Sequence, residues 1–119
     1  MKVAGLHAIS TLLETQAILI RNKNPSDPSL VNKITSRIKG VIAANKYVLL
    51  SYNVTRENLK KAVVVTPGRQ AATVSPLDDE GWVEVQSMVL KKDVAEIMDE
   101  LEEIGARDII LFKIDNCRV

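Results

Sequence analysis

The chain has 119 residues, 46% hydrophobic and 26% charged, which is typical of a globular domain and excludes a mostly disordered chain. Its net charge of +1 conceals an imbalance, +4 over residues 1–45 and −3 over residues 46–119, which argues against the whole chain being a basic nucleic-acid binder. The single cysteine cannot form an internal disulfide and no apolar run is long enough to cross a bilayer, so we expect a cytoplasmic protein with no membrane partner.

The first part of the chain, residues 1–45, is expected to contain a strand and a helix. Residues 16–21 have the unbroken apolar middle of a buried strand. Asp27 provides an N-cap oxygen and Pro28 suits the first helical position, which predicts an amphipathic helix over residues 28–44. The apolar residues with helical spacing are Leu30, Ile34, Ile38, Val41 and Ile42. Because these elements cannot close a core alone, we expect them to pack against something outside the sequence.

The second part, residues 46–119, has the elements of a complete domain. Strict alternation over residues 82–89 places three valines and Ser87 on one face, which we take as the core side. Thr55 is expected to cap a short helix, and Asp93 to begin a second helix that stops at Gly105. The expected strands cover residues 47–53, 72–75, 82–89 and 108–114.

This order, β-α-β-β-α-β, predicts an α+β fold of the ferredoxin-like type. Such a chain folds most simply as a four-stranded antiparallel sheet with both helices on one face. The other face of the sheet would then be free for a ligand, a partner or another subunit. We therefore expect function to reside on that face.

The side chains that could do catalysis are few. His7 is the only histidine, and its apolar surroundings favour a packed or interface role over a catalytic one. Asp78, Asp79 and Glu80 are adjacent in an expected turn, where a solvated turn is favoured over a metal site. Cys117 lacks a neighbouring base. We predict no catalytic residue and no metal ligand in this chain.

Short polar side chains on the expected strands leave two readings open. They can form directed hydrogen bonds to a small ligand, or they can be ordinary polar residues of a sheet edge, and the residues alone do not decide between these. The four are Ser51, Asn53, Thr73 and Ser75. For the aromatic residues, packing is favoured over RNA stacking, because no Lys/Arg-Gly-aromatic signature accompanies them; they are Tyr47, Tyr52, Trp82 and Phe112.

Eight short runs carry a stronger signal than these motifs. They are residues 44–50, 53–59, 66–68 (Thr-Pro-Gly), 73–77, 82–83, 97–101, 105–110 and 117–118. Together they strongly resemble the ATP phosphoribosyltransferase family of histidine biosynthesis, in its long, self-regulated form. The similarity covers essentially the whole chain.

The resemblance implies a function for each part. Residues 46–119 are similar to the family's C-terminal regulatory domain, which binds L-histidine and inhibits the enzyme, and residues 1–45 to the end of its catalytic region. The implied reaction condenses ATP with phosphoribosyl pyrophosphate, with magnesium, in a homo-oligomer that is a dimer or a hexamer. The family's phosphate-binding loop lies upstream of the segment that matches Met1, so we expect this segment to be inactive alone and to hold no cofactor.

Five positions match the family's histidine contacts and form the predicted allosteric site. Thr73 matches a ligand-bonding threonine, and Met88 and Asp108 match main-chain contacts. Two positions depart from the family pattern, since Asn53 replaces a carboxylate and Arg69 replaces an apolar residue. Losing the carboxylate removes a charge-assisted hydrogen bond to the ligand. The alternative to a histidine sensor is a purely structural oligomerisation module without ligand binding.

Overall fold

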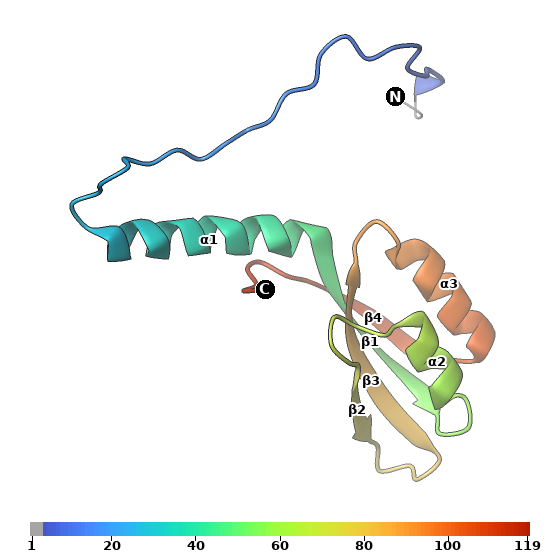
Figure 1. Cartoon of the computed structure of the whole chain (residues 1–119). Helices are drawn as coiled ribbons and strands as arrows, with labels where there is room; N and C mark the ends of the chain where they lie inside the picture. Colours follow the sequence, from blue (N-terminus) through green and yellow to red (C-terminus); the bar gives the residue numbers. More distant parts are fainter. Residues whose placement is uncertain (1–3) are drawn as a thin grey trace.

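The computed structural model describes residues 4–119, which form three helices and four strands (Figure 1). In chain order these are α1 (Pro28–Lys46), β1 (Tyr47–Thr55), α2 (Leu59–Val65), β2 (Thr73–Pro76), β3 (Trp82–Leu90), α3 (Val94–Ile104) and β4 (Arg107–Lys113). No helix within the described part of the chain is long and apolar enough to cross a membrane.

The four strands form one antiparallel sheet in the order β2-β3-β1-β4, and α2 and α3 cover one of its faces (Figure 1). The central strand β1 leads through α2 to the outer strand β2, and the central strand β3 leads through α3 to the outer strand β4. A tight turn joins β2 to β3, which completes the split βαβ arrangement. The predicted ferredoxin-like fold is confirmed.

Alternation along the central strands builds the core between the sheet and these two helices. Every second residue of β1, from Val48 to Val54, is buried, with Leu50 and Tyr52 completely so. The predicted core side of β3 is confirmed, because its three valines and Ser87 are buried. Leu101 of α3 and Ala62 of α2 close the core from the helix side.

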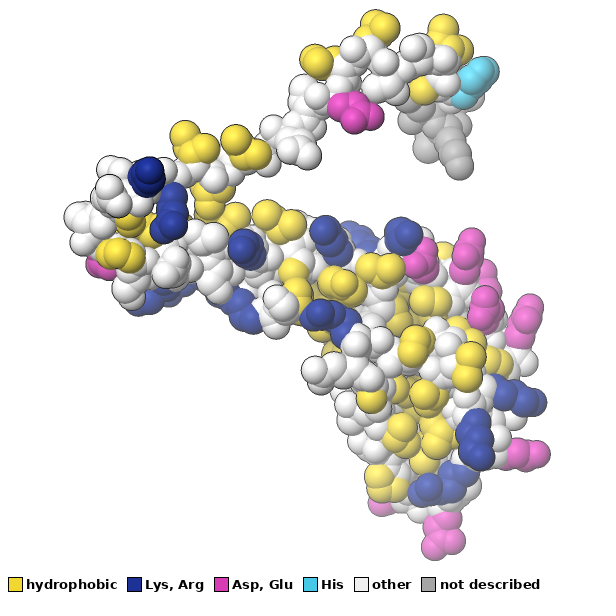
Figure 2. All heavy atoms as spheres, viewed as in Figure 1, with side chains coloured by type: hydrophobic (Ala, Val, Ile, Leu, Met, Phe, Trp, Pro, Cys, Tyr) yellow, Lys and Arg dark blue, Asp and Glu magenta, His cyan; other side chains and the backbone are white. Residues whose placement is uncertain are grey.

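Helix α1 begins where its sequence predicts. Asp27 Oδ1 accepts a hydrogen bond from the N–H of Leu30 at 3.0 Å, and Pro28 is the first helical residue. The helix ends at Lys46, two residues beyond the expected end, and passes into β1 without a loop. Its apolar stripe is exposed and its cations lie along the same helix (Figure 2). The exposed apolar residues are Leu30, Ile34, Ile38, Val41 and Ile42.

The strand expected at residues 16–21 is wrong. This segment has no regular secondary structure, and Ile18, Leu19 and Ile20 are 64–81% exposed. A buried strand needs neighbours that satisfy its N–H and C=O groups, and no strand of the described chain pairs with it. His7 is also exposed, so the described residues do not provide the packing expected for it.

Several element boundaries also differ from the expectation: β1 ends at Thr55, β2 covers Thr73–Pro76 and β3 ends at Leu90. Helix α2 begins at Leu59, because residues 56–58 form a turn in which Thr55 Oγ1 accepts from the N–H of Asn58 at 3.3 Å. Strand β4 covers Arg107–Lys113, one residue earlier at each end. Gly105 ends α3 in the left-handed region with φ 90°, as predicted.

Candidate functional site

The face of the sheet opposite α2 and α3 carries the candidate site, and we call it the open face. Direct cross-strand partners share a face, so the register defines two polar rows across it. The first row joins Thr73, Gln86 and Ser51, and the second joins Ser75, Glu84 and Asn53. An apolar half lies beside them, formed by Leu49, Met88, Ile110 and Phe112.

Glu84 is the centre of the polar half. Its Oε1 accepts from Ser51 Oγ at 2.5 Å and from Gln86 Nε2 at 3.1 Å. These two bonds, above all the one from Ser51, hold the pKa of Glu84 below its usual range. The open face therefore carries a fixed, ionised carboxylate between two hydrogen-bond donors.

Glu84→Gln is expected to make the free energy of unfolding depend less on pH in the acid range. Because the folded-state pKa of Glu84 is lowered, its contribution is present above the ordinary glutamate pKa of about 4.3 and is lost as the pH falls through the lower folded value. Urea unfolding at several pH values measures this. The stability difference between the two proteins should shrink on acidification, and the exposed Glu100→Gln on α3 is the control. A pH-independent difference for Glu84→Gln would contradict this role.

One end of the open face joins β1 to β4. Asn53 Nδ2 donates to Asp108 Oδ2 at 3.0 Å, and Asp108 adopts φ 51°, a conformation that Asp tolerates better than most residues. The pairing of β1 with β4 shifts register here, between Ser51 and Asn53. The Arg107 guanidinium lies 5.0 Å from the centre of the Trp82 ring.

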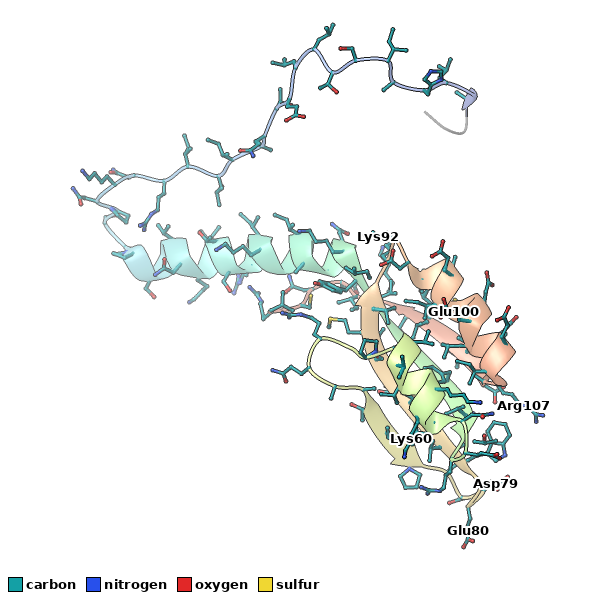
Figure 3. All side chains as sticks on the ribbon, turned by 45° about the vertical axis from the view of Figure 1, so that its right-hand side comes forward. Lys60, Asp79, Glu80, Lys92, Glu100 and Arg107 are labelled. Carbon is teal, nitrogen blue, oxygen red and sulfur yellow. The ribbon has the colours of Figure 1, made fainter. Side chains whose placement is uncertain are left out.

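These side chains surround a hollow of about 210 Å³, which Leu77 and Asp79 complete. Figure 3 shows Arg107 and Asp79 at the same end of the sheet. The hollow combines a cation with two carboxylates and an amide. It can therefore meet both charges of a small zwitterion with opposite charges of its own.

The other end of the sheet is defined by the Thr66-Pro67-Gly68 turn. Thr66 is fully buried; its Oγ1 lies 2.7 Å from Tyr52 Oη, and its carbonyl accepts from Ser87 Oγ at 2.9 Å. Burial raises the pKa of Tyr52, which keeps this hydroxyl protonated. The turn is therefore anchored in the core, and it positions Arg69, which follows it.

Arg69 lies over the ring of Tyr47, with its guanidinium carbon 5.9 Å from the ring centre. The two residues share a hollow of about 320 Å³ with Met88. Pro67, Gly68 and Ile97 also line it. An aromatic ring, a thioether and a guanidinium form a surface that suits a flat, polarisable group.

Comparison with known proteins decides the family. The family described as HisG, C-terminal domain, matches residues 44–116, which is more than half of the chain. The chain belongs to this family. The matched region begins at the last turn of α1 and includes the whole sheet with α2 and α3.

Curated relatives extend the similarity over the full chain. A protein of Yarrowia lipolytica named ATP phosphoribosyltransferase is 61% identical over 119 residues, and proteins of the same name from Candida glabrata and Saccharomyces cerevisiae are 52% and 50% identical. In each case the match covers 100% of this chain and 40% of the relative. The chain thus spans less than half the length of the relatives that it matches.

Within this HisG C-terminal domain, the structure separates the five predicted site residues into three places. Asn53 and Asp108 are hydrogen-bonded in the hollow beside Arg107. Arg69 and Met88 line the hollow at the other end. Thr73 is exposed on the outer strand β2, at the start of the first polar row. Neither of the two hollows described above holds all five.

Sequence reasoning missed the role of Glu84 and its two donors. The strict alternation of β3 did place Glu84 and Gln86 opposite the core, and that was the available signal. What it lacked was the strand register, which brings Ser51 of β1 against them. Among residues 4–119, no group of three or more His, Cys, Asp or Glu side chains is placed to hold a metal ion.

Proposed function

We propose that this chain is the regulatory portion of an ATP phosphoribosyltransferase of histidine biosynthesis. The observation that carries the proposal is the 61% identity, over the whole chain, to a relative of that name. The parent enzyme joins ATP to phosphoribosyl pyrophosphate and releases pyrophosphate, in the cytoplasm. Magnesium would serve the parent's transfer step by neutralising phosphate charge, at a site outside this chain.

The proposed ligand of the regulatory portion is L-histidine. Asn53 replaces the family's carboxylate, but its hydrogen bond to Asp108 Oδ2 brings another carboxylate to the same place. That carboxylate suits an α-ammonium group, and Arg107, beside it, suits an α-carboxylate. Thr73 lies on the opposite outer strand β2, so its hydroxyl would bond the imidazole from a second copy of the chain in the proposed homo-oligomer.

The proposed effect of histidine is allosteric feedback inhibition in a homo-oligomer, a dimer or a hexamer. Inhibition requires that histidine binds one arrangement of subunits more tightly than another. The apolar half of the open face suits a contact with another subunit, because Ile110 and Phe112 are about half exposed. The polar half then lies next to that contact, where a ligand can favour one arrangement.

Thr73→Ala is expected to weaken L-histidine binding by about 0.5–1.5 kcal/mol, the net value of one neutral hydrogen bond. Isothermal titration calorimetry on the 119-residue chain and on the variant measures the difference. Thr11→Ala, the same change at an exposed residue outside the folded domain, is the control and should bind L-histidine as tightly as the unsubstituted 119-residue chain does. Folded chain that binds no L-histidine at all would refute the proposed ligand.

The alternative is a structural module whose open face only joins subunits. It predicts an assembled species in analytical ultracentrifugation whose size does not respond to histidine. The regulatory proposal predicts a shift of that distribution when histidine is added. Formation of phosphoribosyl-ATP by the purified chain would instead show that the segment is catalytic by itself, which we do not expect.

A further inference from the structure

The end of the chain returns to helix α1. After β4 ends at Lys113, residues 114–119 run back beside α1, where Figure 1 shows the C-terminus under the middle of the helix. The N–H of Cys117 donates to the carbonyl of Gly40 at 3.1 Å. Asn116 Nδ2 donates to the carbonyl of Arg37 at 3.4 Å, and Arg118 Nη1 donates to Ser36 Oγ at 2.8 Å. All three acceptors belong to α1 and lie between residues 36 and 40.

Gly40 makes this close approach possible. It is one of two buried residues in α1, although glycine is a poor helix former and most of this helix is exposed. A Cβ at position 40 would collide with the side-chain amide of Asn116, so this amide would have to move and give up its hydrogen bond to Arg37. Because glycine has no side chain, it leaves room for the tail to lie against the helix backbone.

The contact gives α1 a second attachment to the domain. The first is its direct continuation into β1 at Lys46 and Tyr47, where the carbonyl of Lys46 also accepts from the N–H of Lys91 at 2.9 Å. A helix held at one end can pivot about that end. A helix held also near its middle has a fixed direction, because the two attachments lie six or more residues apart.

We propose that residues 114–119 form a strap that fixes the direction of α1 relative to the sheet. The strap continues β4 directly, and the other end of β4 carries Arg107 and Asp108. A displacement of β4 therefore moves the strap and, through it, α1 and whatever precedes α1. The idea that a bound ligand displaces β4 rests on the proposed function, whereas the strap itself does not.

The strap can be tested without any ligand, by pulsed electron paramagnetic resonance on the full 119-residue chain. Spin labels are attached to Ser29→Cys in the first turn of α1 and Glu100→Cys on α3, in a Cys117→Ser background. The backbone N–H that binds Gly40 is kept in that background. The parent should give a narrow distribution of label distances, because α1 has one direction.

Two variants release the strap by independent routes. Gly40→Leu places a side chain where Asn116 lies, and removal of residues 116–119 deletes the contact without altering the helix. Both should broaden the distance distribution severalfold. Asn32→Leu, which places the same leucine side chain at an exposed residue of α1, should leave it narrow. Unchanged widths in the truncated chain would overturn the proposal, even if Gly40→Leu failed to fold.

A second measurement separates release of the tail from motion of the helix. In chains that keep Cys117, its half-buried thiol should react severalfold faster with a maleimide in Gly40→Leu than in the parent. Faster reaction together with broader label distances supports the strap. Faster reaction with an unchanged distance distribution would overturn it, because the tail would then dock without fixing α1.

Discussion

Leu101→Ala is expected to lower the free energy of unfolding by about 2–5 kcal/mol, the largest effect that we predict. Leu101 is completely buried, and it is the residue of α3 that enters the core between the sheet and α2. Truncation would remove its transfer free energy and leave a cavity, because the close-packed core around it relaxes only in part.

Urea unfolding followed by circular dichroism measures this loss. Val64→Ala is the matched control, because Val64 is 80% exposed on the neighbouring helix α2 and should change stability by no more than about 0.5 kcal/mol. Equal effects at the two positions would contradict the placement of α3 on the sheet. The loss at Leu101 should also loosen the Thr66–Gly68 turn, because α2 contacts α3 and leads into that turn.

Gly68→Ala is expected to destabilise the domain by about 1–3 kcal/mol. It should also weaken the proposed binding of L-histidine, because it displaces Arg69, which the family resemblance assigns to the ligand. Gly68 has φ 69°, a left-handed conformation that side chains disfavour. A Cβ there would lie 3.1 Å from both the carbonyl oxygen of Ala71 and Ser87 Oγ. The backbone oxygen cannot move away easily, so the turn must shift, and Arg69 shifts with it.

Gly81→Ala is the matched control for this prediction. Gly81 has no positive φ, and a Cβ there would meet only Asp79 Oδ1, at 3.6 Å. Its substitution should be neutral, or stabilising by about 0.4–1 kcal/mol through the unfolded state. Thermal unfolding and calorimetry with L-histidine test both variants. A Gly68→Ala protein as stable as the Gly81→Ala protein would show that the turn is not strained.

The elements that the sequence predicted well are those with local causes. Asp27 and Pro28 begin α1 through a cap and a fixed φ, and Gly105 ends α3 because it tolerates a positive φ. The alternation of β3 placed its valines in the core because one face of this sheet is buried. Each of these signals acts within a few residues, so a single sequence contains it.

The strand expected at residues 16–21 failed for the opposite reason. Apolar character indicates that a segment is suited to burial, but a strand also needs a partner for its backbone, and no sequence pattern supplies that partner. The candidate site was predictable in part. The resemblance selected Asn53 and Thr73, whereas Glu84 gained its role only from Ser51, which is 33 residues away in the sequence.

The sequence by itself determined the ferredoxin-like order of elements, the core face of β3, the two-part charge pattern and the family, because these depend on local spacing and on residue identity. The tertiary structure alone decided which polar groups meet on the open face, how the five expected site residues divide between the ends of the sheet, and where the tail lies against Gly40. The physical reason is that such contacts depend on strand register and on close approach of distant segments, which the packed chain fixes as a whole.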